Sequence, residues 1–432
     1  MLSQVVRSRL SRGGLLAKLA IIGSGISGLT AAYILKDIHE VTIYEADNRF
    51  GGHAHTHEIR ESEEKQVNVD SGFIVHNERT YPYLLRIFKE LGIKTQETEM
   101  SMSINCKGCG LQYAGGRGAK GILAQPAKLF DPRFVMMLIE VPRFYREAKK
   151  LLKDDSKREM TWGEFLERFK FSKYFIRHYA VPVVSCVWSS GDGDSLQYPA
   201  RHLFQFLQNH GMLELGNSPI WRTVVGGSHR YVEAIIEKLP NSRINDSVKA
   251  IRRFDNYVEV TSEKMVSNYD YVIIATHANT AAKILVDATL EEAKNLAAIG
   301  YSTNQTWLHT DSKLLPDLMP ARASWNYMMG SCSGETEKVL VSYWMNLLMR
   351  LNTDKDYVVT LNGAGQVAED KVIAKMTYEH PVFTLQSVVA ADYLKSAGGS
   401  RLAFAGAHLG WGFHEDGARS GVEAARKFGG TW

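Results

Sequence analysis

The sequence contains few cysteines, and this scarcity limits the classes of protein to which it can belong. Four cysteines occur in 432 residues, which is too few for a disulfide framework, so a reducing compartment is expected. No apolar run reaches the roughly 18 residues that a membrane-spanning helix needs. The sequence also lacks tandem repeats and low-complexity tracts. These absences predict a globular protein without a transmembrane segment.

An excess of charge of either sign is also missing. The 51 basic and 47 acidic side chains give a formal net charge of +4, which is too weak to indicate a nucleic-acid partner. This charge is compatible with peripheral contact with an anionic membrane surface. Hydrophobic residues make up 45% of the chain, which is enough for a sizeable core, and the length favours two domains over one.

The first 17 residues have a composition of their own. They carry Arg7, Arg9 and Arg12 together with serines, and the first acidic residue of the chain is Asp37. This pattern is typical of a mitochondrial presequence, and the alternative is a disordered basic extension. We therefore predict that residues 1–17 lie outside the fold, and that the protein is mitochondrial or cytoplasmic.

Two of the cysteines form a C-x-x-C pair, Cys106 and Cys109, in "NCKGCGLQY". Such a pair can be a redox site or half of a zinc site. A zinc site needs two more ligands, and Cys186 and Cys332 are isolated in the sequence. The flanking residues indicate a strand, a glycine-rich turn and a second strand. We therefore expect the tip of a hairpin and predict no metal site.

The stretch "LAIIGSGISGLTAAYIL" combines a short apolar strand with glycines in G-x-G-x-x-G spacing and a following helix. Gly23 permits a tight turn, Gly25 lets the backbone approach a pyrophosphate, and Gly28 lets the helix pack closely on the strand. Ser24 and Ser27 add hydroxyl donors. The helix N-terminus attracts phosphate through its free N–H groups and its dipole. The stretch predicts dinucleotide binding.

A second strand, "VTIYEAD", ends at Glu45, which follows Gly23 by 22 residues. A carboxylate at this distance meets the ribose hydroxyls of a bound dinucleotide. The chain then continues into another glycine-rich turn that suits a ligand longer than NAD. The additional candidate residues of this turn are Ala46, Arg49, Gly51, Gly52 and His53.

Together, "GSGISGL", Glu45 and "RFGG" resemble the opening of the flavin-containing amine oxidase superfamily. The resemblance implies FAD and an α/β fold, in which a doubly wound, Rossmann-like FAD-binding domain carries a second, mixed α+β substrate domain. It also implies a discontinuous FAD-binding domain of residues 18–76, 222–285 and 395–432. The substrate domain would then comprise residues 77–221 and 286–394.

The same resemblance assigns further cofactor-binding residues. The segment that includes Gly72 and Phe73 passes beside the flavin in this superfamily. The residue that matches Val248 meets the adenine through its backbone. The turn that contains Thr276 and His277 lies near the phosphates.

Near the C-terminus, the stretch "GFHEDGARSGVEAA" follows a short strand that ends at Gly406. In the superfamily this closing segment and its helix cap the flavin ring and the pyrophosphate, which implies contacts from Gly406, Ala407 and Gly417. We expect the helix from Ala418 onward, with its N–H groups facing the pyrimidine side of the flavin. One departure is that Ala407 and His408 stand where the superfamily usually has an acidic residue.

The closing stretch also contains His414, Glu415 and Asp416 in succession. Three adjacent residues cannot all face one ion from a regular element, so a metal site is not predicted here. His414 is either a proton carrier beside the flavin or a loop residue bonded to backbone. Because no cysteine follows Cys332, a thioether to the flavin near this motif is excluded. We therefore predict noncovalent FAD, with attachment through His408 or His414 as the alternative.

Longer stretches narrow the resemblance to one branch of the superfamily. The segments "NERTYP", "WLHTDSKLLP", "ASWNY", "SYWMN" and "GFHEDGARSG" are similar to bacterial proteins predicted to bind NAD or FAD. This branch also forms the N-terminal part of plant cyclopropane-fatty-acid synthases. The resemblance implies an FAD-dependent oxidoreductase that acts on a lipid acyl chain or a similar apolar substrate. We take His414, Tyr343 and Trp411 as the catalytic candidates.

Two alternatives stay open. A flavin amine oxidase would need an aromatic cage around a neutral amine, which Tyr343, Trp344 and Trp411 can supply. A non-catalytic, FAD-bound partner of a lipid methyltransferase is the second alternative, because the plant enzymes fuse the two parts. The stretch "FDPRFVMMLIEVPRFYREAKKLL" places apolar residues beside basic ones. It is either an ordinary surface helix or a region that contacts lipid.

Overall fold

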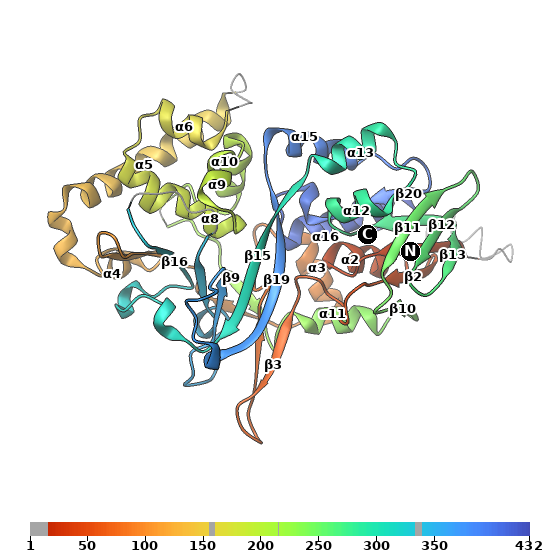
Figure 1. The fold of residues 1–432 in the computed structure, drawn as a ribbon, viewed down its shortest axis with the longest axis horizontal. Coiled ribbons are helices and arrows are strands. Elements are labelled where there is room, and N and C mark those ends of the chain that lie inside the picture. Colours follow the sequence, from red (N-terminus) through yellow and green to blue (C-terminus); the bar gives the residue numbers. More distant parts are fainter. Residues whose placement is uncertain (1–15, 155–159, 215, 333–338) are drawn as a thin grey trace.

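The computed structural model describes residues 16–154, 160–214, 216–332 and 339–432. Two lobes lie side by side, and two long strands, β15 (Gly300–His309) and β19 (Val372–Val382), run between them (Figure 1). The predicted N-terminal extension falls almost entirely on residues 1–15, which lie outside the described residues. Its first described residues, 16 and 17, lead directly into the first strand.

The first lobe is built on a five-stranded parallel sheet with β1 at its centre. The strand order is β10 (Asn241–Arg243), β2 (Glu40–Tyr44), β1 (Lys18–Ile22), β14 (Tyr271–Ile274) and β20 (Leu402–Phe404). Segments from the beginning, middle and end of the chain therefore share one sheet. This arrangement confirms the predicted doubly wound α/β fold.

Both faces of this sheet are buried, as parallel sheets require. Leu19 and Ile21 face one cluster of apolar side chains, and Ala20 and Ile22 face another. The first face is covered by α2 (Ile26–Leu35), α3 (Pro82–Leu91), α11 (His229–Ile236) and α16 (His414–Lys427). The second is covered by β11 (Val248–Arg253), β12 (Val258–Ser262), β13 (Val266–Tyr269), α12 (Ala278–Ile284), α13 (Leu290–Ala297) and α15 (Leu385–Leu394).

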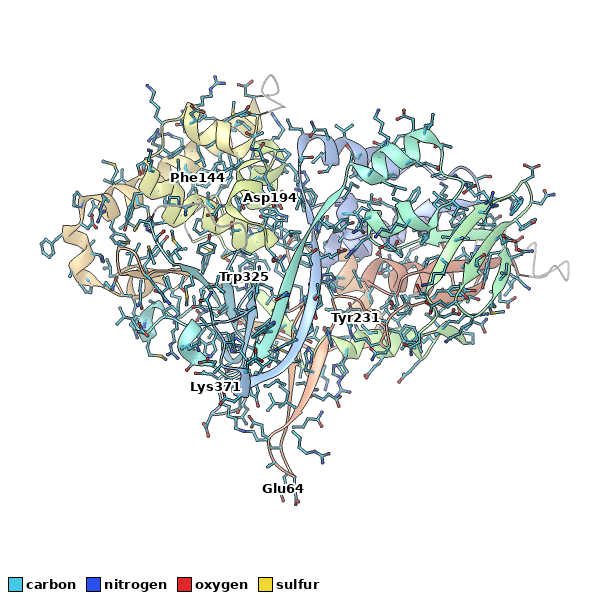
Figure 2. The ribbon with its side chains drawn as sticks, in the orientation of Figure 1. Glu64, Phe144, Asp194, Tyr231, Trp325 and Lys371 are labelled. Atoms are coloured by element: carbon cyan, nitrogen blue, oxygen red, sulfur yellow. The ribbon has the colours of Figure 1, made fainter. Side chains whose placement is uncertain are left out.

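The second lobe contains a seven-stranded mixed sheet beneath a layer of helices (Figure 1). After β19 and β15, the strand order continues with β18 (Val358–Leu361), β17 (Val341–Trp344), β16 (Trp325–Met329), β7 (Met102–Cys106) and β8 (Leu111–Gly115). The helices of this lobe are α4 (Gly118–Ile122), α5 (Pro132–Lys153), α6 (Trp162–Arg168), α7 (Lys173–Phe175), α8 (Val181–Trp188), α9 (Asp192–Leu196), α10 (Ala200–Asn209) and α14 (Met345–Leu348). Figure 2 shows Phe144 in this helical layer and Trp325 on the sheet.

The helical layer and the sheet share an aromatic core. Phe144 of α5 lies 5.7 Å from Phe204 of α10 and 5.2 Å from Trp162 of α6, measured between ring centroids. The same apolar cluster includes Tyr327 of β16 and Val341 of β17. Burial of this many large side chains fixes the helices on the sheet.

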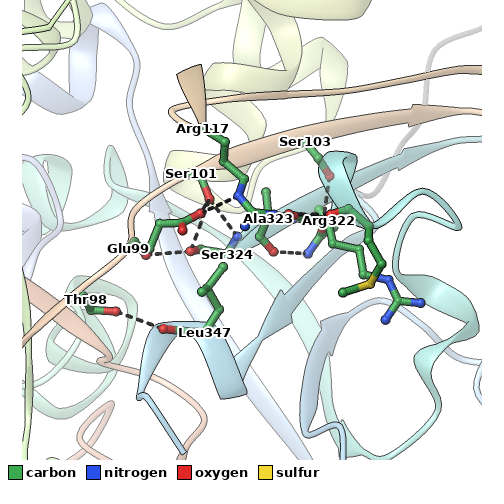
Figure 3. Close-up of polar contacts among 11 residues, drawn as sticks. Thr98, Glu99, Ser101, Ser103, Arg117, Arg322, Ala323, Ser324 and Leu347 are labelled. Carbon is green, nitrogen blue, oxygen red and sulfur yellow. Dashed lines mark hydrogen bonds and ion pairs between the residues drawn. The ribbon is translucent and has the colours of Figure 1, made fainter. Parts of the chain in front are cut away.

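Strands β7 and β16 are parallel neighbours, and a polar network fastens the ends at which they begin (Figure 3). The Ser324 hydroxyl donates to the carbonyl of Glu99 at 2.6 Å, and the Ser324 N–H donates to the Ser101 hydroxyl at 3.1 Å. Arg117 forms an ion pair with Glu99 at 3.0 Å. These contacts set the register in which Cys106 lies beside Met329.

Two small sheets connect the lobes. One is the hairpin β3 (Thr56–Arg60) and β4 (Gln66–Asp70), and the other has the order β5 (Val75–Asn77), β9 (Trp221–Val224) and β6 (Thr95–Thr98). Helix α3 lies within the predicted substrate range of residues 77–221, yet Leu84 and Ile87 pack in the core of the first lobe. Leu296 of α13 and Leu394 of α15 pack in that lobe as well.

The cysteine pair lies at the turn of the β7–β8 hairpin, as expected from the sequence. Cys332, however, is not isolated, because its Sγ lies 3.6 Å from the Sγ of Cys106. The parallel pairing of β7 with β16 brings these two residues together although they are 226 positions apart in the chain. Cys332 is therefore isolated in the sequence but not in the fold.

Across the four described ranges, no helix has both the length and the apolar character needed to cross a bilayer.

Candidate functional site

The turn between β1 and α2 has the geometry that the glycine spacing predicts. Gly23 has a φ of +103°, and a Cβ there would lie 2.8 Å from the carbonyl oxygen of Ala275. A Cβ on Gly28 would lie 2.0 Å from the carbonyl oxygen of Gly23. Only glycine allows the helix to begin this close to the strand.

Gly25 differs from these two glycines because a Cβ on it would meet no protein atom within 4 Å. It precedes the first turn of α2, and the helix's first backbone bond runs from the Leu29 N–H to the Gly25 carbonyl, at 3.0 Å. The N–H groups of Ile26 and Ser27 precede that bond, so they are available to an outside acceptor. The space in front of Gly25 thus suits an anionic group.

Glu45 lies at the end of β2, beside this turn. Its carboxylate accepts hydrogen bonds from the backbone N–H of Ser24 at 3.1 Å and from the N–H of Asp47 at 2.9 Å. Its own carbonyl accepts the N–H of Asp246 at 2.9 Å, which places the start of β11 and Val248 beside Glu45. The carboxylate is therefore fixed where a ribose would lie next to a phosphate bound at α2.

The second glycine-rich turn folds back onto the first. Gly51 has a φ of +111°, and its N–H donates to the Ser24 carbonyl at 3.1 Å. A Cβ on Gly52 would lie 3.2 Å from the Cα of Gly25. Arg49 donates to the carbonyl of Ala54 at 3.3 Å, so this side chain braces the turn.

The end of the chain returns to the same place. A Cβ on Gly417 would lie 2.5 Å from Ile26, and one on Gly421 would lie 2.3 Å from the Ser27 carbonyl oxygen. The Ser420 hydroxyl accepts the N–H of Gly406 at 2.9 Å. Helices α2 and α16 are thus in close contact (Figure 1), and the predicted motifs from both ends of the sequence converge.

Residues that lie between these motifs in the sequence meet in the same region of the fold. A Cβ on Gly72 would lie 2.2 Å from the carbonyl oxygen of His53, and the Phe73 N–H donates to that carbonyl at 2.7 Å. The Phe73 ring stacks on His414, with 3.8 Å between centroids. Thr276 lies beside Gly23, its Cγ2 being 3.4 Å from a Cβ built there. Nearby, Ala407 lies 3.8 Å from a Cβ built on Gly417.

The three polar residues at the start of α16 point to three different partners. The Glu415 carboxylate accepts the N–H groups of Tyr83 and Leu84 at 2.9 and 3.0 Å, so it caps helix α3. The Asp416 carboxylate accepts the N–H of Phe413 at 3.1 Å and therefore caps α16 itself. The helix begins at His414, four residues earlier than predicted, because of this cap.

His414 lies between Phe73 and Tyr231, whose hydroxyl is 3.1 Å from Nε2. Burial lowers the pKa of His414 to about 3, so the imidazole is neutral near pH 7. A neutral ring stacked on Phe73 supports the wall of the site and is a poor proton carrier at this pH.

Of the other two catalytic candidates, Tyr343 lies in the second lobe, and Trp411 lies in the loop before α16 and packs against the core of the second lobe. Tyr343 packs edge to face on Trp325, with 5.7 Å between ring centroids. The Trp411 indole donates to the carbonyl of His202 at 3.1 Å. Trp344, the third residue of the supposed aromatic cage, directs its indole to Asp356 at 2.9 Å. Adjacent strand residues face opposite sides of a sheet, so Tyr343 and Trp344 cannot form one wall of a cage.

Two residues of β19 that the sequence did not single out face the cofactor motifs. The ring of Tyr378 lies 5.0 Å from that of His53, and His380 lies 5.5 Å from it. Burial lowers the pKa of His380 to about 4, and burial with the neighbouring His380 lowers the pKa of His53. Tyr378 and His380 are two positions apart, so both lie on one face of the strand. This spacing was the signal in the sequence that could have identified them.

His277 lies on the other side of this group. It is 6.0 Å from His53 between ring centroids, and its Nδ1 lies 3.1 Å from the Glu379 carboxylate. The junction of the two lobes therefore combines imidazole and phenol side chains with a carboxylate that already has a partner.

Similarity to known proteins identifies the family of this chain. A family model described as flavin containing amine oxidoreductase matches residues 26–427. The chain belongs to this family. Membership implies a flavin cofactor, and the converging glycine motifs fit its dinucleotide form: an open cradle at Gly25, N–H groups at the start of α2, and a fixed carboxylate at Glu45.

The relatives agree on the fold and differ in chemistry. Amine oxidase [flavin-containing] A of Canis lupus familiaris is 26% identical over 310 residues, covering 67% of this chain and 55% of that protein. The chain therefore spans about half the length of the curated relatives it matches. Cyclohexylamine oxidase from Brevibacterium oxydans has a TM-score of 0.69 at 15% identity, with coverage of 95% and 98%. A fatty acid isomerase from P. acnes, which produces CLA, has a TM-score of 0.67 at 15% identity, with coverage of 96% and 99%.

Proposed function

We propose that the protein is an oxidoreductase with noncovalently bound FAD, and that it oxidises a lipid acyl chain taken from a membrane surface. Ser24, Gly25 and Glu45 would bind the adenosine and pyrophosphate part, and the first turn of α16 would approach the flavin. The flavin accepts two electrons when it is bound, while the protein orients the substrate and excludes water.

An exposed apolar patch on the second lobe carries this proposal. The patch consists of Leu123, which directly follows α4, Leu129 and Phe130 of the 3-10 turn Pro126–Phe130, and Met136 and Ile139 of α5. Phe130 is 91% exposed and Ile139 is 58% exposed. Apolar side chains gathered on a surface mark an interaction site. Lys120 and Arg133 are exposed in the same stretch. Arg133 forms an ion pair with Asp131 at 2.8 Å, so Lys120 is the basic residue that suits an anionic lipid surface.

Helix α5 joins this patch to the interior. Met136 and Ile139 face outward, while Phe134, Met137 and Phe144 of the same helix are buried. An ordinary surface helix would be polar on its outer face. The buried face belongs to the same apolar cluster as Phe206, which stacks on Phe413 at 4.6 Å, just before α16. An acyl chain would follow this aromatic layer from the surface toward the flavin.

Family membership supports the amine-oxidase alternative. Two structural relatives of the chain, cyclohexylamine oxidase and putrescine oxidase, are named for amines. The particular cage of Tyr343, Trp344 and Trp411 is not formed, because the Trp344 indole donates to Asp356. The likeness to a fatty acid isomerase supports the acyl alternative at the level of fold. A non-catalytic role as partner of a lipid methyltransferase would require no flavin turnover.

Vesicle binding tests the proposed lipid contact. Phe130→Asp removes an apolar contact of roughly 2 kcal/mol and adds a negative charge, so binding to phosphatidylserine vesicles should weaken by at least about tenfold. The matched control is Leu290→Asp, because Leu290 is 90% exposed on the other lobe. Anaerobic flavin bleaching by unsaturated phospholipid vesicles should slow in the first variant and stay unchanged in the second. Equal binding by both variants would contradict the membrane contact.

A further inference from the structure

Four potential metal ligands meet in the second lobe, away from the glycine motifs. Cys106 ends β7, Cys109 lies in the hairpin turn, Cys332 follows β16, and His178 lies in the π-helical turn Ile176–Ala180. One ligand atom from each of the four residues lies within 4.8 Å of the other three. Three separate parts of the chain therefore converge on one point.

Two of the six distances between ligand atoms are known individually, and both match the edges of a tetrahedron around zinc. The two sulfur atoms of Cys106 and Cys332 are 3.6 Å apart, and Cys109 Sγ is 3.6 Å from His178 Nε2. Zinc bonds of about 2.3 Å to sulfur and about 2.0 Å to nitrogen give edges of roughly 3.5 to 3.8 Å. A disulfide would need its two sulfur atoms at about 2.05 Å.

The histidine is oriented as a ligand. Its Nδ1 lies 3.1 Å from the carbonyl oxygen of Tyr174, so the ring proton resides on Nδ1 and the Nε2 lone pair faces the sulfur atoms. The ring also stacks on Tyr174, with 4.0 Å between centroids. The hydroxyl of Tyr113 donates to the His178 carbonyl at 2.7 Å, which fixes the π-helical turn. Single π-helical turns are frequent at functional sites.

The backbone around the cysteine pair is adapted to this convergence. A Cβ on Gly108 would lie 2.7 Å from the backbone nitrogen of Cys332, so only glycine lets the two segments approach. Gly110, directly after the pair, has a φ of +67°. Lys128 donates to the Cys109 carbonyl at 2.7 Å. Its positive charge favours a site in which three thiolates leave one negative charge on a bound Zn²⁺.

We propose that Cys106, Cys109, His178 and Cys332 bind one Zn²⁺ in a closed Cys₃His site. Binding replaces three thiol protons with three zinc–sulfur bonds and releases those protons to solvent. Soft thiolates with one imidazole in tetrahedral arrangement select zinc over hard cations. Four protein ligands leave no open position, so the site is structural. It ties the β7–β8 hairpin and the end of β16 to the helix that continues into α8.

Metal content tests the site independently of flavin. Protein purified from zinc-supplemented medium should contain about one zinc per chain by mass spectrometry, and Cys109→Ser or Cys332→Ser should reduce this to below about 0.1. Cys186→Ala is the matched control, because Cys186 is the one cysteine of the four that lies outside the cluster. It should retain zinc. His178→Cys should retain it as well, because a fourth thiolate replaces the imidazole.

X-ray absorption on the unaltered protein removes any dependence on how the variants fold. The zinc edge should show three sulfur ligands at about 2.3 Å and one nitrogen ligand at about 2.0 Å. Zinc-free protein with a full complement of flavin would overturn the proposal. So would zinc that survives both serine substitutions, or a zinc-free Cys106–Cys332 disulfide detected by thiol titration. Flavin absorbance, recorded in parallel, reports separately on the proposed function.

Discussion

At the scale of single residues, the site depends on positions where a side chain is excluded for different reasons. At Gly23 and Gly28 any larger residue is excluded, because its Cβ would lie 2.8 and 2.0 Å, respectively, from a backbone oxygen of the protein. A Cβ on Gly25 would meet no protein atom within 4 Å, so we expect the requirement for glycine at this position to come from the proposed ligand. This contrast makes Gly25 the most informative residue of the motif.

Gly25→Val should give protein with little or no bound flavin, because the new side chain occupies the pyrophosphate path. No protein atom lies within 4 Å of the added Cβ, so a loss of flavin would not come from a clash of that atom inside the protein. Gly193→Val is the matched control, because a Cβ there also meets no atom within 4 Å. The absorbance ratio at the flavin and protein bands measures occupancy. Full occupancy in Gly25→Val would contradict the assignment.

At the scale of elements, the contact between α2 and α16 holds the cofactor motifs together. A Cβ on Gly421 would lie 2.3 Å from the Ser27 carbonyl oxygen, so even alanine must push the helices apart. This displacement would move the first turn of α2, where the phosphates are expected to bind. Stability and flavin affinity should therefore change together.

Gly421→Ala should lower the free energy of unfolding by about 1–3 kcal/mol through overpacking, and flavin affinity should fall with it. Glu423→Ala on the same helix is the control, because Glu423 is exposed. Urea denaturation of the flavin-free and flavin-loaded forms measures both effects. An unchanged unfolding midpoint for Gly421→Ala would show that the helices are not in the described contact.

Some helices and strands could be predicted from the sequence because neighbouring residues determine them. The glycine spacing after an apolar strand predicted β1 and α2. The helix was predicted from Ala418 onward, after Gly417, whereas it begins at His414 because the Asp416 carboxylate accepts the N–H of Phe413. The approach of His380 to His53, and of Cys332 to Cys106, depends on strand pairing between distant segments. Residue spacing contains no signal for such pairing.

At the scale of the whole molecule, buried histidines link stability to pH. Burial lowers the pKa of His76, His202, His210 and His309 to about 4. The unfolded chain binds these protons near pH 6.5. The stability that these groups contribute is therefore complete above pH 6.5 and is lost as the pH falls toward 4. Burial raises the pKa of Asp70 and Asp416 to about 6, which acts in the opposite direction.

The histidines outnumber these carboxyl groups, so the free energy of unfolding should fall between pH 6.5 and pH 4.5. Each histidine contributes about 1.4 kcal/mol per pH unit in this range. The variant His309→Gln should reduce the slope by about one proton, because Gln does not titrate. The fold should be kept, because Gln can still bond to Thr360, which lies 2.8 Å from the His309 Nε2. Urea titrations at several pH values measure the slope. Stability that rises on acidification would contradict the burial of neutral imidazoles.

The central proposal is that the second lobe takes up a lipid through its exposed apolar patch while the first lobe binds the flavin. The most direct test is anaerobic mixing of the flavin-loaded protein with a panel of substrates, followed by flavin absorbance in a stopped-flow instrument. Unsaturated phospholipids and fatty acids should bleach the flavin, and primary, secondary and aromatic amines should leave it oxidised. Rapid bleaching by an amine, with every acyl substrate inert, would contradict the account and establish an amine oxidase.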